Sequence, residues 1–429
     1  MAQKNGYSLV ECNEGAAHKD EHETLLQGGA AGSEISIRRR QAPWKGDQKN
    51  ENGIFFGHDI GFDFRPLRRL STNGSLRITL LLEVRKMRKV FISLTALVLI
   101  FGVSVGAATA GTINWKITTF WPAASEGYTT MVQFAERMDA ATNGRLKIKT
   151  YPGGALIPKN EQHAAVASGI IQGAFSWGGF ITGVQPAFSP LTDLLGAYED
   201  AMLLYDFFWY GGGMELMNQL YEPFGVMSLG PVIGGVESLL AKKPIAEPED
   251  FKGVKIRSSE GMLADLFKAL GGSVVVMGPG EMVQALDKGV IDAGDCSCPS
   301  QNYKYGCHRV AKYFTYPGFH SLPAGDFFVN PKAFAKLPID IQNIMRDEVK
   351  LWCIEFSQQV RITDAERVQD MIKGGRVPVK WRDENLKKFR KIAAGVWAEY
   401  GKKNAQCVQA IELHKKFLTR LGMGDIFKN

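Results

Sequence analysis

The sequence predicts a two-lobed α/β protein in which one long helix runs along both lobes. Residues 251–296 alternate short apolar runs with helical segments, in the order strand, helix, strand, helix, strand. Residues 113–177 repeat this order. From Pro338 to Lys373 the apolar residues keep a helical period, with no Pro or Gly after the first position. Two α/β units imply two lobes, and a helix of this length is expected to pass along both.

Composition and charge describe an ordinary globular protein. The chain has 429 residues, of which 45% are apolar and 22% charged, and its net charge is +7. No stripe of Lys and Arg is interleaved with aromatic residues, and the excess of basic side chains is small. We therefore expect no nucleic-acid partner.

The strongest targeting signal begins at Met87. Basic residues around it precede the uncharged run 90–105, and small residues ending at Ala108–Ala110 follow. This is the pattern of a secretory signal peptide, which we assign to residues 87–110, with export to the periplasm. A transmembrane anchor is the alternative, but the run is short for one. Residues 1–86 show no sustained period and are expected to be an extension from a misplaced start, or unfolded.

The first unit is expected to hold strands at 113–120, 146–151 and 170–177. A helix from about Tyr128 ends at Asn143-Gly144, because Asn and Gly readily adopt the left-handed conformation that stops a helix. The aromatic-rich region 198–221 is expected to form two helices, separated at three consecutive glycines.

Later segments complete the two units. Residues 226–233 and 238–241 are expected to form a strand pair, and 314–329 to hold strands with turns at its prolines. One final helical segment is expected from Glu384 to about Leu421.

The second unit carries the first candidate binding residue. Its first strand ends at Arg257 and its last ends near Asp295. Because the carboxyl ends of parallel strands meet at one edge of a sheet, both residues are expected at one ligand-binding rim. The planar guanidinium of Arg257 suits a carboxylate or a phosphate.

Motifs of catalysis are missing from the sequence. There is no phosphate-binding Gly-rich loop, no G-x-S-x-G and no H-E-x-x-H, so a binding protein is favoured over an enzyme. An exported enzyme using Cys296 and His308 is the weaker alternative. Cys296, Cys298 and Cys307 could form a disulfide, bind a metal, or remain reduced packing thiols.

The sequence resembles the substrate-binding subunits of the tripartite ATP-independent periplasmic (TRAP) transporters in four motifs. In chain order these are DFKGVKIR, ALGG, GEMVQALDKGVIDA and VAKYFTYPG. The resemblance covers residues 111–429 and is greatest to the branch that binds 2-oxo acids and other monocarboxylates. It implies the two-lobed periplasmic binding protein fold, with a hinge and a long helix spanning both lobes. We place one lobe at 111–233 and 323–360, and the other at 234–322 and 361–429.

The resemblance also implies a function. The protein would bind a small organic acid between its lobes, as a monomer or dimer, and deliver it to the permease subunits of a TRAP transporter. A sensor subunit that reports a ligand to a signalling partner is the alternative. No cofactor is expected, except a Na or Ca ion bound with the substrate.

Site residues follow from the family motifs. Arg257 matches the Arg that binds the substrate carboxylate, and we expect Arg257→Ala to abolish binding with little effect on the melting temperature. Where relatives place a Glu and a Trp that hold a metal ion and the substrate, this chain has Asp295 and Cys296. Where relatives have a Gln and a Trp beside paired glycines, it has Val232 and Val236. Because of these departures, the sequence leaves open whether a metal ion is bound and whether the ligand is a 2-oxo acid.

Further candidates for the pocket are aromatic. Trp121 and Trp177 follow strand ends and are expected to stack on a ligand, although a core position would explain them as well. Phe319 and His320 follow a Pro-Gly turn, where relatives carry aromatic and acidic pocket residues.

Overall fold

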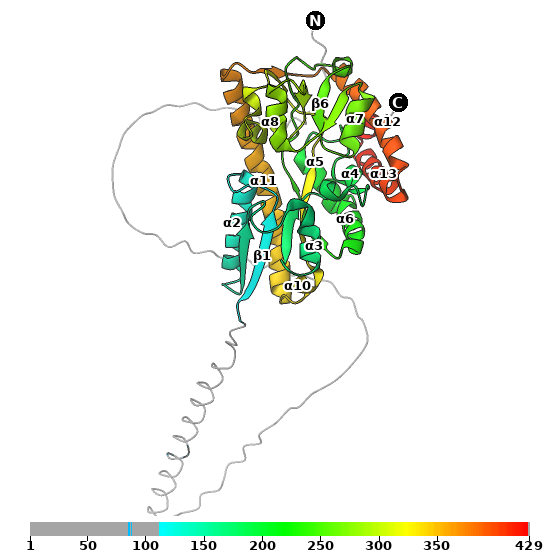
Figure 1. Ribbon diagram of the computed structural model, residues 1–429. Helices are drawn as coiled ribbons and strands as arrows, with labels where there is room; N and C mark the ends of the chain where they lie inside the picture. Colours follow the sequence, from blue (N-terminus) through cyan, green and yellow to red (C-terminus); the bar gives the residue numbers. More distant parts are fainter. Residues whose placement is uncertain (1–84, 86, 88–110, 428–429) are drawn as a thin grey trace, which may run out of the picture. The chain divides into compact units, whose positions relative to one another are not determined.

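The computed structural model describes Arg85, Met87 and residues 111–427 (Figure 1). The expected signal peptide and the extension before it lie outside the described residues, apart from Arg85 and Met87. None of the described helices is both long and apolar enough to cross a membrane.

The first sheet has five strands in the order β2-β1-β3-β10-β4. β1 is parallel to both β2 and β3, as expected for strands joined by helices. β10 is antiparallel to β3 and β4. The strands are β1 (Ile113–Thr119), β2 (Leu146–Tyr151), β3 (Gly173–Ser176), β4 (Met227–Ile233) and β10 (Ala324–Val329).

The second sheet has six strands in the order β11-β9-β5-β8-β6-β7. β6 lies between β7 and β8 and is parallel to both, which confirms the parallel unit predicted at 251–296. The strands are β5 (Leu240–Ala241), β6 (Lys255–Ser258), β7 (Ser273–Val276), β8 (Ala293–Gly294), β9 (Tyr313–Thr315) and β11 (Val377–Val379).

Two segments carry the chain directly from a strand of one sheet to a strand of the other. The expected pairing of 226–233 with 238–241 is wrong, because β4 belongs to the first sheet and β5 to the second. Residues 234–239 therefore cross between the sheets. Residues 316–323 cross back, from β9 to β10. Short apolar runs close together in sequence look like a hairpin, and only their partners distinguish a hairpin from a crossover.

The long helix α11 (Ile339–Lys373) is confirmed. It packs on α2 and β4 of the first lobe and on α9 and β11 of the second. Figure 1 shows it running from the region of α2 to the region of α8. Trp352, Phe356 and Val360, spaced at a helical period, are buried along it.

The remaining helices cover the sheets. The final segment predicted as one helix is two, because the chain breaks at 402–404 and the side chain of Asn404 caps the next helix by accepting from the Cys407 N–H. The helices are α2 (Glu126–Ala141), α3 (Gln162–Ala167), α4 (Phe188–Thr192), α5 (Ala201–Tyr210), α6 (Gly213–Tyr221), α7 (Met262–Ala269), α8 (Pro279–Asp287), α9 (Pro299–Lys304), α10 (Pro331–Ala335), α12 (Asp383–Gly401) and α13 (Ala405–Arg420).

Candidate functional site

Arg257 lies near the carboxyl end of β6, and its side chain is buried. Its Nε donates to the backbone carbonyl of Met277 at 3.0 Å, and its Nη1 donates to the backbone carbonyl of Asp295. Met277 follows β7 and Asp295 follows β8. The guanidinium therefore joins the ends of both neighbouring strands, at the edge where the sequence placed Arg257 and Asp295 together.

No carboxylate neutralises this guanidinium within residues 111–427, because no ion pair there includes Arg257. Both described hydrogen bonds of its side chain go to neutral carbonyl groups. A buried positive charge of this kind is costly unless an anion completes its surroundings. The Arg257 side chain is thus suited to hold an anionic group.

Asp295 and His320, both expected in the site, contact one another. The His320 Nε2 lies 2.8 Å from Oδ1 of Asp295, and both side chains are almost fully buried. The other ring nitrogen, Nδ1, is buried without a hydrogen-bond partner. Asp295 thus links the Arg257 edge, through its carbonyl, to His320, through its carboxylate.

Two further carboxylates, Glu237 and Asp193, complete this group and were not identified from the sequence. The hydroxyl oxygen of Ser321 lies 2.6 Å from Oδ2 of Asp193 and 2.7 Å from Oε2 of Glu237. A hydroxyl has one proton and donates to one acceptor at a time, so the second short contact needs a proton on a carboxyl group. We call Asp193, Glu237, Asp295, His320 and Ser321 the crossover cluster.

The pKa values of Asp193 and Glu237 are both raised, which agrees with a proton on one of these two carboxyl groups. Burial raises the pKa of Asp193 to about 7. Burial, followed by the neighbouring charges of Asp295 and Asp193, raises the pKa of Glu237 well above its usual range. Three carboxyl groups share one imidazole here, so the fully ionised cluster would carry a net negative charge inside the protein.

A cation could also balance this charge. One ligand atom from each of Glu237, Asp295 and His320 lies within 4.8 Å of the others. Carboxylate oxygens suit hard ions such as Na⁺ and Ca²⁺, whereas an imidazole is a ligand of transition metals. The two carboxylates therefore fit the expected ion better than the histidine does.

The crossover cluster takes its name from the position of three of its members in the chain. Glu237 lies in the crossover 234–239, and His320 and Ser321 lie in the crossover 316–323. The backbone N–H of Glu237 donates to the carbonyl of Ser321 at 2.9 Å, so the two crossovers run against each other. One signal for Glu237 existed in the sequence, because it is the lone charge in the run 223–241 after Glu222.

The cysteines of the described residues are free thiols. Cys298 and Cys307 are buried, whereas Cys296 is partly exposed. Burial raises the pKa of the Cys296 thiol well above its usual range, and the positive charge of Arg257 opposes this only in part. A thiol held protonated is a poor nucleophile. His308, the other half of the enzymatic alternative, stacks on Tyr303 with ring centroids 4.0 Å apart.

The aromatic candidates divide into two groups. Phe319 is buried in a core environment. Its ring centroid lies 4.3 Å from that of Trp381 and 4.9 Å from that of Phe389. Trp121 is partly exposed and stacks on Phe175 at 3.7 Å. Trp177 is partly exposed, and its indole N–H has no hydrogen-bond partner. That nitrogen is itself buried, so Trp177 keeps one unused hydrogen-bond donor in the protein interior.

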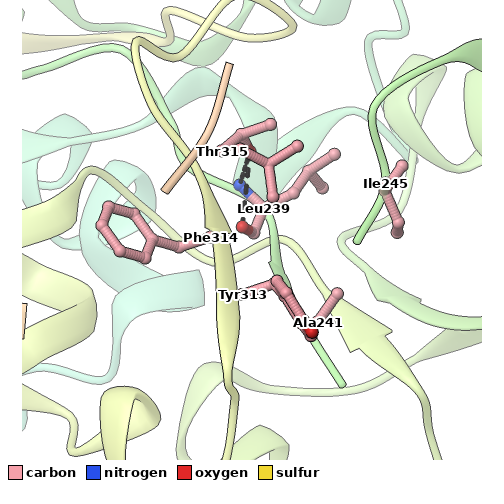
Figure 2. A pocket seen from close by; sticks show the side chains of 7 residues that line it. Leu239, Ala241, Ile245, Tyr313, Phe314 and Thr315 are labelled. Carbon is pink, nitrogen blue, oxygen red and sulfur yellow. Dashed lines mark hydrogen bonds between the residues drawn. The ribbon is translucent and has the colours of Figure 1, made fainter. Parts of the chain in front are cut away.

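A small pocket lies elsewhere on the second sheet, between β5, β9 and β11 (Figure 2). Its walls include Leu239, Ile245 and Phe314, and the Thr315 hydroxyl beside them is hydrogen-bonded to the backbone of Leu239. No charged side chain lines it. A carboxylate would lose its hydration there without gaining a partner, so this pocket does not suit an anionic ligand.

The chain is similar in sequence to known solute-binding proteins. The family model for bacterial extracellular solute-binding protein, family 7, matches residues 117–404, which is more than half of the chain. A monocarboxylate 2-oxoacid-binding periplasmic protein of Nostoc sp. is 28% identical over 346 residues, covering 78% of this chain and 93% of that protein.

The chain is also similar to solved structures of periplasmic solute-binding proteins. A TRAP periplasmic solute-binding protein from Rhodobacter sphaeroides, described as an apo open structure, is 32% identical, with a TM-score of 0.64 over 72% of this chain and 99% of that one. One from Pseudoalteromonas atlantica, solved with bound sodium and pyruvate, has the same fold, with a TM-score of 0.64, 23% identity and coverage of 74% and 97%. The chain therefore belongs to the family 7 extracellular solute-binding proteins, the solute receptors of TRAP transporters.

Proposed function

We propose that this protein is an extracytoplasmic receptor that binds a small organic acid between its two lobes and delivers it to a TRAP-type membrane permease. The observation that carries this proposal is the buried guanidinium of Arg257, which has no carboxylate partner among the described residues and lies at a strand edge. A charge-assisted hydrogen bond to a carboxylate contributes about 1.5–3 kcal/mol.

In the proposed mechanism the lobes are 111–233 with 323–360, and 234–322 with 361–429. The crossovers 234–239 and 316–323 act as the hinge, because each joins a strand of one sheet to a strand of the other. The ligand favours the closed form only through the contacts that closure adds. Arg257 supplies the charge partner, while Trp121 and Trp177 supply stacking surfaces from the first lobe.

The ligand class that we propose is the 2-oxo acids. This rests on the Nostoc relative, whose name states that specificity, and on the bound pyruvate of the Pseudoalteromonas protein. Cys296, partly exposed beside Asp295, would border the ligand and leave more room than the Trp of related proteins. We assign no direct ligand contact to Phe319, because it packs in the core. His320 would act through Asp295, which it contacts.

A Na or Ca ion is part of the proposal, with Asp295 as its ligand and Glu237 as the second carboxylate. Such an ion would supply positive charge to the substrate carboxylate and balance the negative crossover cluster. Sodium in the Pseudoalteromonas protein supports this assignment. Removal of the ion with a chelator, followed by metal analysis and a pyruvate titration with and without added Na⁺ or Ca²⁺, tests it. Equal affinity in every case would contradict it.

The protein would work in the periplasm, after export through the signal peptide at 87–110. Its partners are the permease subunits, and it would act as a monomer or a dimer, without nucleic acid. We infer a receptor rather than an enzyme. Turnover of an organic acid that Cys296→Ala abolishes would favour the enzyme instead. A sensor subunit has the same binding chemistry but a different partner, so capture of a signalling protein in place of a permease would favour that function.

The decisive experiment is mass spectrometry of the small molecule that co-purifies with the native protein, followed by calorimetric titration of pyruvate and other small acids. A bound monocarboxylate, with binding lost in Arg257→Ala, supports the proposal. A neutral ligand, or full affinity in Arg257→Ala, would refute it. Dicarboxylate or uronate binding would keep the receptor function and reject the 2-oxo acid class.

A further inference from the structure

The carboxylate of Glu126, at the start of α2, reaches across to α9. Its Oε2 accepts a hydrogen bond from Nε2 of Gln301 at 3.0 Å, and its Oε1 pairs with Nζ of Lys304. Lys304 also donates to the carbonyl of Ala124 at 3.4 Å. Gln301 and Lys304 are three residues apart on one helix and so share a face. Both carboxylate oxygens of Glu126 are thus held by a single face of α9.

The two sides of this contact belong to different lobes. α2 packs on β2 of the first sheet and follows the loop after β1. α9 follows β8 of the second sheet, directly after the loop that contains Asp295 and Cys296. The contact therefore joins the loops beyond the carboxyl ends of a strand in each sheet. These are the edges where two-lobed α/β proteins hold their ligands.

Each side of the contact is firmly anchored. On α2, the side chain of Ser125 caps the helix by accepting from the Tyr128 N–H at 3.2 Å. On α9, the backbone N–H of Ser300 donates to Asp364 at 2.7 Å, and the side chain of Asn302 donates to the carbonyl of Ser238 at 3.1 Å. Separation of the lobes would therefore break the Glu126 contacts rather than bend the helices that carry them.

The contact is also suited to break and form repeatedly. Glu126 is 13% exposed and Lys304 is 36% exposed, so water can replace each partner when they separate. A fully buried ion pair would have to overcome the desolvation of both charges each time it formed, so its net contribution can be small. An exposed pair would contribute little. Partial exposure gives a contact that is strong enough to bias an equilibrium and weak enough to open.

We propose that Glu126, Gln301 and Lys304 form a latch that holds the two lobes closed and so sets the rate at which the bound acid leaves. This rests on the proposed function, because it assumes that the lobes open and close around a ligand. The latch acts on the closed form itself, so its loss would raise the dissociation rate and leave the association rate nearly unchanged.

Charge reversal tests the latch, with pyruvate as the probe and tryptophan fluorescence in a stopped-flow instrument as the measurement. We expect Lys304→Glu to release pyruvate roughly three to ten times faster, in line with the strength of partly exposed ion pairs. Glu126→Lys should do the same. The double swap Glu126→Lys/Lys304→Glu should recover most of the slow release, because it restores an opposite-charge pair.

Lys415→Glu is the matched control. Lys415 is 37% exposed, like Lys304, and it pairs with Glu412 at 2.8 Å, but both residues lie on α13. This variant has the same change in charge, but the ion pair that it breaks lies within one helix and does not involve α2 or α9, so it should release pyruvate at the wild-type rate. Higher ionic strength should speed release from the wild type and have much less effect on Lys304→Glu, since salt screens the pair.

Release from Lys304→Glu at the wild-type rate would overturn the latch while leaving the receptor function intact, since Arg257→Ala tests that function separately. If the wild type fails to bind pyruvate, the proposed ligand class is wrong, and small-angle scattering of the ligand-free proteins decides on the latch. The latch predicts a larger radius of gyration for Lys304→Glu than for the wild type and Lys415→Glu. Equal radii would then overturn it.

Discussion

The crossover cluster and the latch both join segments of the two lobes through acidic side chains, yet their surroundings differ. In the crossover cluster, Asp295 and His320 are nearly fully buried. In the latch, Glu126 and Lys304 remain in contact with water. Three members of the cluster, Glu237, His320 and Ser321, lie on segments where the chain itself passes between the sheets. The latch instead joins residues 175 and more positions apart in sequence.

This difference indicates which parts can separate. We expect groups on the two crossovers to stay close when the lobes move, because the backbone N–H of Glu237 is bonded to the Ser321 carbonyl and the chain continues through both segments. Buried acidic groups are therefore tolerated there, because a proton on one of the carboxyl groups beside Ser321 lowers their total charge. The latch is joined through the side chains of Gln301 and Lys304, so we expect its two sides to part when the lobes open in the proposed mechanism. Single substitutions test this division, and those with the strongest predicted effect come first.

Arg257→Ala should have the largest effect, a loss of at least about 100-fold in pyruvate affinity, because the ligand charge would remain unpaired. Calorimetric titration measures this loss. Arg257→Lys keeps the charge but loses the fork, and should fall between the alanine variant and the wild type. The control for the lysine variant is Arg382→Lys. The Arg382 side chain is 71% exposed and pairs with Glu384, which is not one of the candidate site residues. Affinity in Arg257→Ala within threefold of the wild type would remove Arg257 from the site.

The structure also changes one expectation for Arg257→Ala. The sequence suggested little effect on the melting temperature, but the guanidinium donates to the carbonyls of Met277 and Asp295. Its removal leaves buried acceptors without donors, so the free energy of unfolding should fall by about 1–3 kcal/mol. Urea denaturation of the ligand-free variant measures this free energy. An unchanged value would support the earlier expectation that Arg257→Ala has little effect on stability.

Glu237→Gln should raise stability at neutral and alkaline pH. The pKa of Glu237 is raised in the folded state, so its stabilising contribution is complete below its unfolded pKa of about 4.3 and is lost as the pH rises toward the folded pKa. The wild type should therefore lose free energy of unfolding from about pH 4.5 upward, and the glutamine variant should lose less. Chemical denaturation at several pH values checks this. Identical pH profiles would show that the carboxyl group is balanced by other means.

Asp326→Asn tests a buried carboxyl group that lies within the first sheet, for comparison with Glu237→Gln in the crossover cluster. Asp326 is buried in β10, accepts from the hydroxyl of Tyr221 at 3.0 Å, and has its pKa raised by burial to about 7. Stability should again fall as the pH rises from about 4 toward 7, with a slope of at most about 1.4 kcal/mol per pH unit. The asparagine variant should flatten this part of the profile and leave pyruvate affinity unchanged. A large loss of affinity would show that Asp326 affects ligand binding as well as stability.

Lys304→Glu should have the smallest effect on stability. Its ion pair is partly exposed, so the free energy of unfolding of the ligand-free protein should change by less than about 1 kcal/mol. The same variant should change the release of pyruvate, which separates the latch from the crossover cluster. Urea denaturation measures the first quantity, and a loss of several kcal/mol would make Lys304 a structural residue instead.

Features that depend on neighbours along the chain could be predicted from the sequence. The helical period of α11 and the Pro and Gly at its ends lie within one segment. The parallel unit of β6, β7 and β8 follows from helices between short apolar runs, and it places Arg257 and Asp295 at one edge. Local backbone preference and side-chain period are enough for these conclusions.

The partners of residues far apart in sequence became known from the three-dimensional structure. It assigned β4 and β5 to different sheets, buried Phe319 against Trp381, and brought Glu237 and Asp193 to Ser321. It also set Glu126 against α9. A lone carboxylate has the same local pattern whether it lies in solvent, in a buried cluster or in a latch. Its role depends on desolvation and on charges that distant segments bring to it, and no local pattern encodes those.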